Sequence, residues 1–251
     1  MSFLVESRGT GSNTVVLLHG IPSDVSWGHE LATALAPFAR VLVPHLPGYG
    51  QMPAAVPYDW AQVHGDLVAT LAEHHADRPI LVGFSGGSWR ALELALQPGV
   101  GPRGVVCLSG TASLELAERD GFRQFAQALR AGVDLRPLAG PRFLARKAGD
   151  DSAVATVQGW LSACPPAALA AELEALAAQP DLVSRLKALD CPVLVRSGTL
   201  DQPCPPVKAR AIAAACQRGS LELVEGAGHA LLLEDSDETI ASVTRFVGGL
   251  S

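Results

Sequence analysis

The order of strands and helices constrains the fold of this chain more than any other feature of its sequence. Short apolar or β-branched runs predict strands at 15–19, 40–44, 79–84, 104–109, 192–197 and 220–225. Most of these runs are apolar throughout, as in strands that are buried on both faces of a sheet. Between them, apolar residues recur every three to four positions, which is typical of amphipathic helices. The alternation predicts an α/β fold with a mostly parallel sheet flanked by helices.

This alternation stops between residues 111 and 187. The stretch contains no convincing strand, only Ala- and Leu-rich helical segments divided by prolines at 137, 141, 165, 166 and 180. At 251 residues, the chain has the length of one to two domains. We therefore predict one core domain, made of residues 1–110 and 188–251, with an all-helical cap inserted at 111–187.

The composition excludes several classes of protein. Hydrophobic residues make up 48% of the chain and charged residues 18%, which is incompatible with a largely disordered protein. The net charge of −6 and the scattered Lys and Arg residues argue against a nucleic-acid or membrane partner. Apolar runs fall far short of the ~20 residues of a membrane span, and the N-terminus lacks a signal-peptide pattern. Five cysteines without CxxC spacing are typical of reduced thiols, so we expect a cytoplasmic protein without a metal site.

A five-residue pattern marks the first candidate for chemistry. Residues 83–87 read GFSGG, directly after a predicted strand and at the start of a predicted helix. In this setting a G-x-S-x-G pattern is typical of a nucleophile elbow, a turn so tight that only very small residues fit on either side of the serine. Such a turn lifts the Ser85 hydroxyl above the carboxyl-terminal edge of the sheet. Ser85 is therefore the expected nucleophile.

A serine nucleophile needs a base and a carboxylate that orients the base. His229 lies on a glycine-lined loop between the last predicted strand and the last helix, whereas the histidines at 29, 64, 74 and 75 belong to helical patterns and are expected at the surface. Asp201 follows the strand at 192–197, at the sheet edge where open α/β sheets place their sites. The competing acids fit less well, because Asp150 and Asp151 lie in the insertion and Asp190 precedes its strand. The predicted triad is Ser85, Asp201 and His229.

The negative charge that develops on a substrate oxygen needs hydrogen-bond donors. One is expected from the backbone N–H of Gly86, the residue after the nucleophile. The loop after the first long strand reads His-Gly-Ile-Pro at 19–22, and its proline has no N–H to donate. We therefore assign the second oxyanion-hole donor to Ile21.

Together these residues resemble the α/β-hydrolase superfamily over essentially the whole chain. The resemblance rests on VVLLHGIP at 15–22, Trp27, PGYG at 47–50, GFSGG at 83–87, SGTLD at 197–201 and GAGH at 226–229. It is strongest to small bacterial esterases, lactonases, cofactor-free haloperoxidase-type perhydrolases and carbon–carbon bond hydrolases. Two positions depart from the usual pattern. His45 stands where an acidic residue is usual, and Gly86 stands where a bulky residue is frequent, which is expected to widen the pocket floor.

The resemblance and the triad together imply a serine hydrolase that cleaves a small or medium ester, lactone or thioester through an acyl-enzyme, without a cofactor. The alternatives left open are a carbon–carbon bond hydrolase of the meta-cleavage type, a cofactor-free perhydrolase, and a low-turnover ligand receptor that retains the triad. Dehalogenase and epoxide hydrolase chemistry in this superfamily uses an elbow aspartate, and this chain has Ser85.

The cap is expected to line the substrate pocket. Its large apolar side chains are Phe122, Phe125, Phe143, Trp160 and Leu161, and they predict a small-molecule substrate with an apolar portion. The sequence singles out no cap arginine as an anchor for a carboxylate, and it leaves the oligomeric state open.

Overall fold

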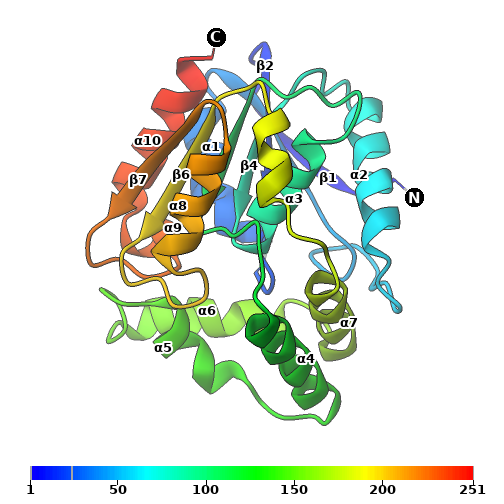
Figure 1. The fold of residues 1–251 in the computed structure, drawn as a ribbon, viewed down its shortest axis with the longest axis vertical. Coiled ribbons are helices and arrows are strands. Elements are labelled where there is room, and N and C mark those ends of the chain that lie inside the picture. The colour runs from blue at the N-terminus through cyan, green and yellow to red at the C-terminus, as the bar shows by residue number, and fades with distance from the viewer. Residues whose placement is uncertain (1, 24, 251) are drawn as a thin grey trace.

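The computed structural model describes residues 2–23 and 25–250, and seven strands of this part of the chain form a single sheet (Figure 1). The strands are β1 (Val5–Arg8), β2 (Asn13–Leu18), β3 (Ala39–Pro44), β4 (Ile80–Phe84), β5 (Gly104–Leu108), β6 (Val193–Gly198) and β7 (Gly219–Val224). Their spatial order is β1-β3-β2-β4-β5-β6-β7, with β1 antiparallel to β3 and every other pair parallel. The predicted mostly parallel sheet is confirmed.

The helices outside residues 111–187 cover both faces of the sheet. They are η1 (Val25–Gly28), α1 (His29–Leu35), α2 (Trp60–Glu73), α3 (Gly86–Ala95), α8 (Pro206–Ala215), α9 (Leu231–Glu234) and α10 (Ser236–Gly248). Figure 1 shows α1 and α10 behind the sheet and α3 and α8 in front of it. Every residue of β2, β4, β5 and β6 is buried, as this double cover requires.

Strand β1 is the one strand that the sequence analysis missed. Its residues, VESR, carry no apolar run, because β1 is an edge strand that is only partly buried. It pairs with β3 from Val5 opposite Pro44 to Arg8 opposite Val41. Its Glu6 lies 3.0 Å from Nε2 of His45, whose Nδ1 accepts a hydrogen bond from the Gln51 N–H at 3.1 Å. His45 therefore ties the turn after β3 to the edge strand.

Between β5 and β6 the described chain contains helices and no strand. They are α4 (Leu116–Arg130), η2 (Arg136–Leu138), α5 (Ala139–Phe143), α6 (Asp151–Ser162), α7 (Pro166–Ala177) and η3 (Val183–Ala188). Helices α4 to α7 lie across the carboxyl ends of the strands (Figure 1), whereas η3 packs beside α8 at the flank of the sheet. The domain boundaries at 110 and 188 stay a prediction.

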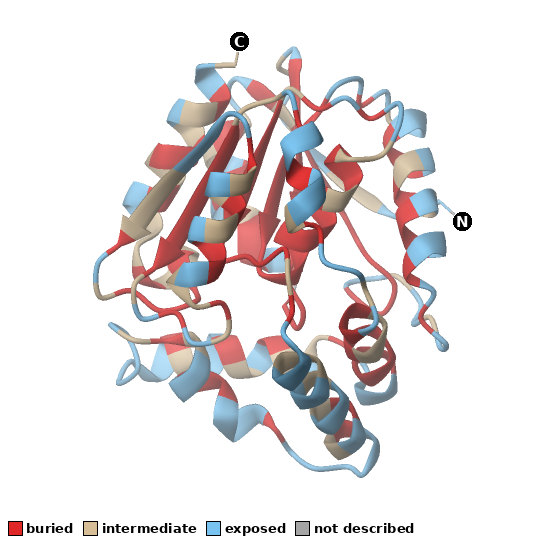
Figure 2. Cartoon of the chain, in the orientation of Figure 1, coloured by how far each residue is buried: buried red, intermediate tan, exposed pale blue. Residues whose placement is uncertain are grey.

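Burial differs between the helices that cover the carboxyl ends of the strands. The outward faces of α4 and α5 are exposed, while α7 is mostly buried between α4 and the sheet domain (Figure 2). Helix α7 is therefore the element through which this helical layer packs most closely on the rest of the molecule. None of the helices in the described part of the chain has the length and hydrophobicity that crossing a bilayer requires.

Candidate active site

Ser85 occupies a sharp turn between β4 and α3. Its φ of 52° and ψ of −120° lie in a region that L-residues rarely adopt, so the backbone is strained here. The flanking glycines are sterically required, because a Cβ on Gly83 would lie 2.2 Å from the Gly87 oxygen and a Cβ on Gly87 would lie 2.1 Å from the Leu18 oxygen. The Ser85 N–H donates to the Leu108 oxygen at 2.9 Å, which holds the turn on β5. This geometry matches the elbow that the glycine pattern predicts.

The structure brings Asp201 and His229 into direct contact. Nδ1 of His229 lies 2.9 and 3.0 Å from the two carboxylate oxygens of Asp201, and both side chains are buried. The Cys204 N–H also donates to Asp201 Oδ1 at 2.8 Å, which fixes the carboxylate. With its Nδ1 proton on Asp201, the imidazole keeps a lone pair on Nε2, the atom that a general base uses.

Nε2 of His229 has no hydrogen-bond partner among the described residues. The imidazole packs between the rings of Phe84 and Phe143, at centroid distances of 5.1 and 5.0 Å. Phe84 directly precedes Ser85, so the imidazole of His229 lies beside the elbow. The hydrogen bond from Ser85 to His229 is not formed in this structure, and such bonds commonly tighten only when substrate is bound.

The loop that carries His229 is fastened to the chain after α5. The Phe143 oxygen accepts hydrogen bonds from the N–H groups of His229 at 2.9 Å and Ala230 at 3.1 Å. The Glu234 carboxylate accepts from the N–H groups of Ala145 and Lys147 at 2.6 and 2.9 Å, and also from that of Gly228. Sequence reasoning missed Glu234, because no local pattern shows that its carboxylate joins two distant backbone segments.

The two residues assigned to the oxyanion hole line the same pocket as Ser85. Neither the Ile21 nor the Gly86 N–H donates to another residue in the described ranges, so both are free to bind an oxyanion. A Cβ on Gly86 would lie 2.8 Å from Ile21 Cγ1. The expectation that Gly86 widens the pocket floor is therefore wrong, because the Ile21 side chain fills the space that the glycine leaves.

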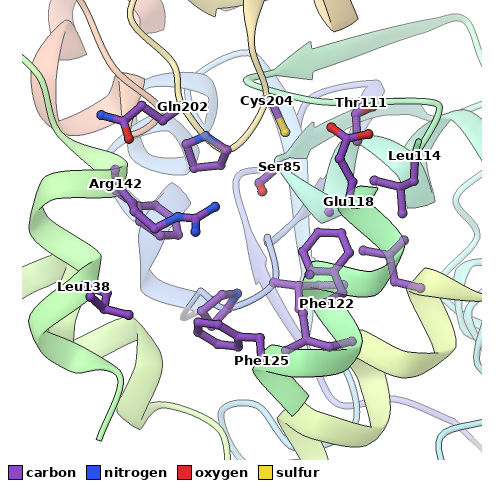
Figure 3. A pocket seen from close by; sticks show the side chains of 18 of the residues that line it. Ser85, Thr111, Leu114, Glu118, Phe122, Phe125, Leu138, Arg142, Gln202 and Cys204 are labelled. Carbon is purple, nitrogen blue, oxygen red and sulfur yellow. The ribbon is translucent and has the colours of Figure 1, made fainter. Parts of the chain in front are cut away.

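A largely apolar cavity of about 410 Å³ lies beside Ser85, which lines it (Figure 3). Phe122, Phe125, Phe143 and Leu161 line it, as the sequence predicts. Trp160 does not. Its ring contacts Phe84 and Phe143, at centroid distances of 5.7 and 6.0 Å, and it lines a separate cavity of about 130 Å³ beside Trp27. The prediction that Trp160 lines the substrate pocket is corrected accordingly.

Sequence reasoning also missed a buried ionic cluster behind the elbow helix. Arg90 on α3 is fully buried and donates through Nη2 to Glu172 on α7 at 2.5 Å and to the Tyr58 hydroxyl at 2.8 Å. The Tyr49 hydroxyl donates to the other Glu172 oxygen at 2.6 Å. The Arg90 guanidinium also lies 4.1 Å from the centroid of the Trp60 ring. This cluster joins α3, α7 and the segment before α2.

His64 borders this cluster. The expectation that it lies at the surface is wrong, because the residue is only 4% exposed, and its Nδ1 hydrogen-bonds with the Trp60 oxygen at 2.9 Å. Burial and the charge of Arg90 lower the pKa of His64 to about 3, although the Glu93 carboxylate lies 3.5 Å from Nε2. The imidazole is therefore neutral in the folded protein at neutral pH.

The lowered pKa of His64 predicts a loss of stability in mild acid. Between the usual histidine pKa near 6.5 and the folded value, the unfolded chain binds a proton that the folded protein does not. The free energy of unfolding keeps its full value above pH about 6.5 and declines as the pH falls below it. At pH about 5 this protonation has lowered it by about 2 kcal/mol. Urea unfolding above pH about 6.5 and at pH about 5 should show that the free energy of unfolding falls less in His64→Phe than in wild type. Equal losses in both proteins would contradict this assignment.

No group of three or more His, Cys, Asp or Glu residues in the described part of the chain is arranged to hold a metal ion. What the geometry provides is a buried carboxylate–imidazole pair, a hydroxyl on a strained turn and two free backbone donors.

Comparison with known proteins decides the family. A model of the alpha/beta hydrolase family matches residues 15–242. This chain belongs to the alpha/beta hydrolase family. This chain is 32% identical to a pimeloyl-acyl-carrier-protein methyl ester esterase of Aeromonas hydrophila, and the match covers 99% of this chain and 100% of that protein. It is 30% identical to 2-succinyl-6-hydroxy-2,4-cyclohexadiene-1-carboxylate synthase of Klebsiella pneumoniae, across 91% of both.

Solved structures confirm the α/β-hydrolase fold. A thermophilic esterase from Thermogutta terrifontis matches with a TM-score of 0.89 at 23% identity. The match covers 99% of the present chain and 93% of the esterase. The enol-lactonase from Burkholderia xenovorans matches with a TM-score of 0.85 at 22% identity, covering 98% and 96%. These likenesses show the fold, and the chemistry of this chain has to be argued from its own site.

Proposed function

We propose that this alpha/beta hydrolase is a serine hydrolase, which cleaves a small or medium ester-like substrate through an acyl-enzyme. One observation carries the proposal: the Asp201–His229 pair presents a free Nε2 beside the elbow of Ser85. The esterase among the curated relatives supports this chemistry. Two-step acyl transfer needs a nucleophile, a base, an orienting carboxylate and oxyanion donors, and we assign these roles to Ser85, His229, Asp201 and the N–H groups of Ile21 and Gly86.

The proposed reaction follows from these atoms. His229 Nε2 accepts the proton of Ser85 as Oγ attacks the substrate carbonyl, and Asp201 stabilises the imidazolium that forms. The N–H groups of Ile21 and Gly86 hold the negative oxygen of the tetrahedral intermediate. His229 then protonates the leaving group, which departs as an alcohol or thiol. A water molecule activated by the same histidine hydrolyses the acyl-enzyme and releases the acid.

A substrate panel tests the proposal against its alternatives. Purified enzyme would be assayed with p-nitrophenyl esters, lactones and thioesters of matched acyl length, and with a vinylogous diketone whose cleavage changes its absorbance. We expect ester or thioester turnover well above that of a His229→Ala preparation. Turnover of the diketone alone would instead favour carbon–carbon bond hydrolysis. A tight ligand without turnover on any substrate would favour the receptor.

The contact between Gly86 and Ile21 gives a sharper test of the oxyanion hole. In Gly86→Ala the added methyl group would lie 2.8 Å from Ile21 Cγ1, so the Ile21 side chain must move, and we expect the backbone that carries its N–H to move with it. We expect kcat to fall about 10- to 100-fold with little change in KM, since the lost interaction belongs to the transition state. The matched double variant Gly86→Ala/Ile21→Ala removes the contacts with Cγ1 and Cδ1 and leaves only Cβ, at 3.2 Å, so it should recover part of kcat. A double variant no faster than the single one would contradict this account.

A further inference from the structure

Two charged side chains line the cavity beside Ser85, and only one of them is neutralised within the described protein. Glu118 accepts hydrogen bonds from Lys208 Nζ at 2.6 Å and from the Glu115 N–H at 2.6 Å. Arg142 forms no ion pair or side-chain hydrogen bond with any residue that the structure describes. Figure 3 shows its guanidinium pointing into the pocket, between Ser85 on one side and Phe125 and Leu138 on the other. An unpaired cation therefore faces a largely apolar cavity that contains the proposed nucleophile.

The isolation of Arg142 sets it apart from the other arginines of residues 111–187. Five of the seven pair with a carboxylate, at positions 119, 123, 130, 136 and 146. Arg185 is also without an ion pair, but it does not line the cavity. Arg142 alone combines a free charge with a place in the pocket wall.

Hydrogen bonds on both sides of Arg142 fix its position relative to the triad. The Gln202 amide, next to Asp201, donates to the Pro141 oxygen at 3.2 Å. The Phe143 oxygen accepts from the N–H groups of His229 and Ala230. The backbone at Arg142 is therefore attached to the loops of both Asp201 and His229, so the base of its side chain has a fixed place beside these loops.

We propose that Arg142 binds an anionic group of the substrate, and that the substrate class is an ester or thioester whose acyl part ends in a carboxylate. A guanidinium matches a carboxylate with two parallel hydrogen bonds, and it is not already occupied by a protein carboxylate. The apolar wall formed by Phe122, Phe125 and Leu138 suits a methylene spacer between this carboxylate and the scissile carbonyl. Glu118 does not oppose the binding of an anion, because Lys208 neutralises it. The inference rests on the proposed hydrolase function and adds the chemistry of its substrate.

Matched pairs of substrates test the inference. Mono-p-nitrophenyl adipate and suberate carry a terminal carboxylate, while p-nitrophenyl hexanoate and octanoate share their acyl lengths and leaving group. We expect Arg142→Met to lower kcat/KM about tenfold for the carboxylated esters, mainly through KM, and to change the neutral esters by less than about twofold. Because Arg142 is exposed at the pocket rim, salt screens its charge. In wild type, 0.5 M salt should therefore lower kcat/KM for the carboxylated esters relative to that for the neutral esters. The matched control Arg185→Met should leave both series unchanged.

The outcomes separate this inference from the proposed function. If wild type hydrolyses the neutral esters and Arg142→Met affects both series equally or neither, the anion anchor is overturned and the hydrolase assignment stands. If wild type hydrolyses neither series, the hydrolase assignment fails, and binding still tests the anchor. In that case, calorimetry measures the binding of monomethyl adipate to two variants. The double variant Arg142→Met/Ser85→Ala should bind it about tenfold more weakly than the single variant Ser85→Ala. Equal binding would overturn the anchor.

Discussion

Replacing Ser85 with alanine is expected to lower kcat for a p-nitrophenyl ester by about 10³- to 10⁶-fold, the largest effect of any single substitution in this chain. The loss is large because no other described residue presents a hydroxyl on the strained turn beside His229. Residual activity should come from the backbone donors of Ile21 and Gly86 and from the pocket. Steady-state and single-turnover kinetics on purified protein measure the effect.

Ser113→Ala is the matched control for this prediction. Ser113 lies at the same sheet edge, but its side chain does not line the cavity. It should retain activity within about twofold, and both variants should unfold at the wild-type midpoint, since neither removes a packed side chain of any size. Ester hydrolysis by Ser85→Ala at the wild-type rate would contradict the assigned nucleophile.

The second large effect concerns stability rather than chemistry. Glu172→Ala should lower the free energy of unfolding by about 3–5 kcal/mol, because it leaves the Arg90 charge fully buried without its carboxylate. Burial raises the pKa of Glu172, whereas Arg90 and the Tyr49 hydroxyl oppose the rise. Removing the carboxylate therefore leaves the buried Arg90 guanidinium and Tyr49 hydroxyl without the acceptor of their hydrogen bonds. Denaturant unfolding gives the change, and the melting temperature should fall by about 10 °C.

Helix α7 supplies the control for this second prediction. Glu174, two residues further on, pairs with Arg130 at the surface, where both side chains are well exposed. Glu174→Ala should cost less than about 1 kcal/mol, as exposed ion pairs usually do. The double variant Arg90→Met/Glu172→Leu should recover most of the loss, since it leaves no buried charge. If Glu172→Ala and Glu174→Ala cost the same, the buried pair does not hold α7 in place.

Local patterns explain why much of the site can be predicted from the sequence. The glycines around Ser85 and the positions of Asp201 and His229 after strands are local features of the sequence. A parallel sheet brings the loops after its strands to one edge, so the contact between Asp201 and His229 near the Ser85 elbow can be expected without knowledge of side-chain packing. The six predicted strands are confirmed for the same reason, since each is a short apolar or β-branched run or, at 220–225, an alternating one, between turns. The short edge strand β1 lacks that run and was missed.

Features that depend on tertiary packing escaped the sequence analysis. Arg90 and Glu172 are 82 residues apart, and in isolation each has the pattern of an ordinary helix charge. His64 reads as a surface histidine until the cluster buries it. Trp160 lies in the predicted helical layer, but the orientation of α6 turns its ring toward Phe84. The sequence cannot show that Arg142 lacks an ion pair, because this depends on which carboxylates the other arginines of residues 111–187 contact.

Covalent labelling tests the central claim most directly. A fluorophosphonate reacts with a serine whose hydroxyl is activated by a neighbouring base and whose oxyanion site is free. Intact-mass and peptide mass spectrometry should show one adduct per chain on the peptide that contains Ser85, absent in Ser85→Ala and formed far more slowly in His229→Ala. An unlabelled wild-type protein, or an adduct at another residue such as the neighbouring Cys204, would contradict the account.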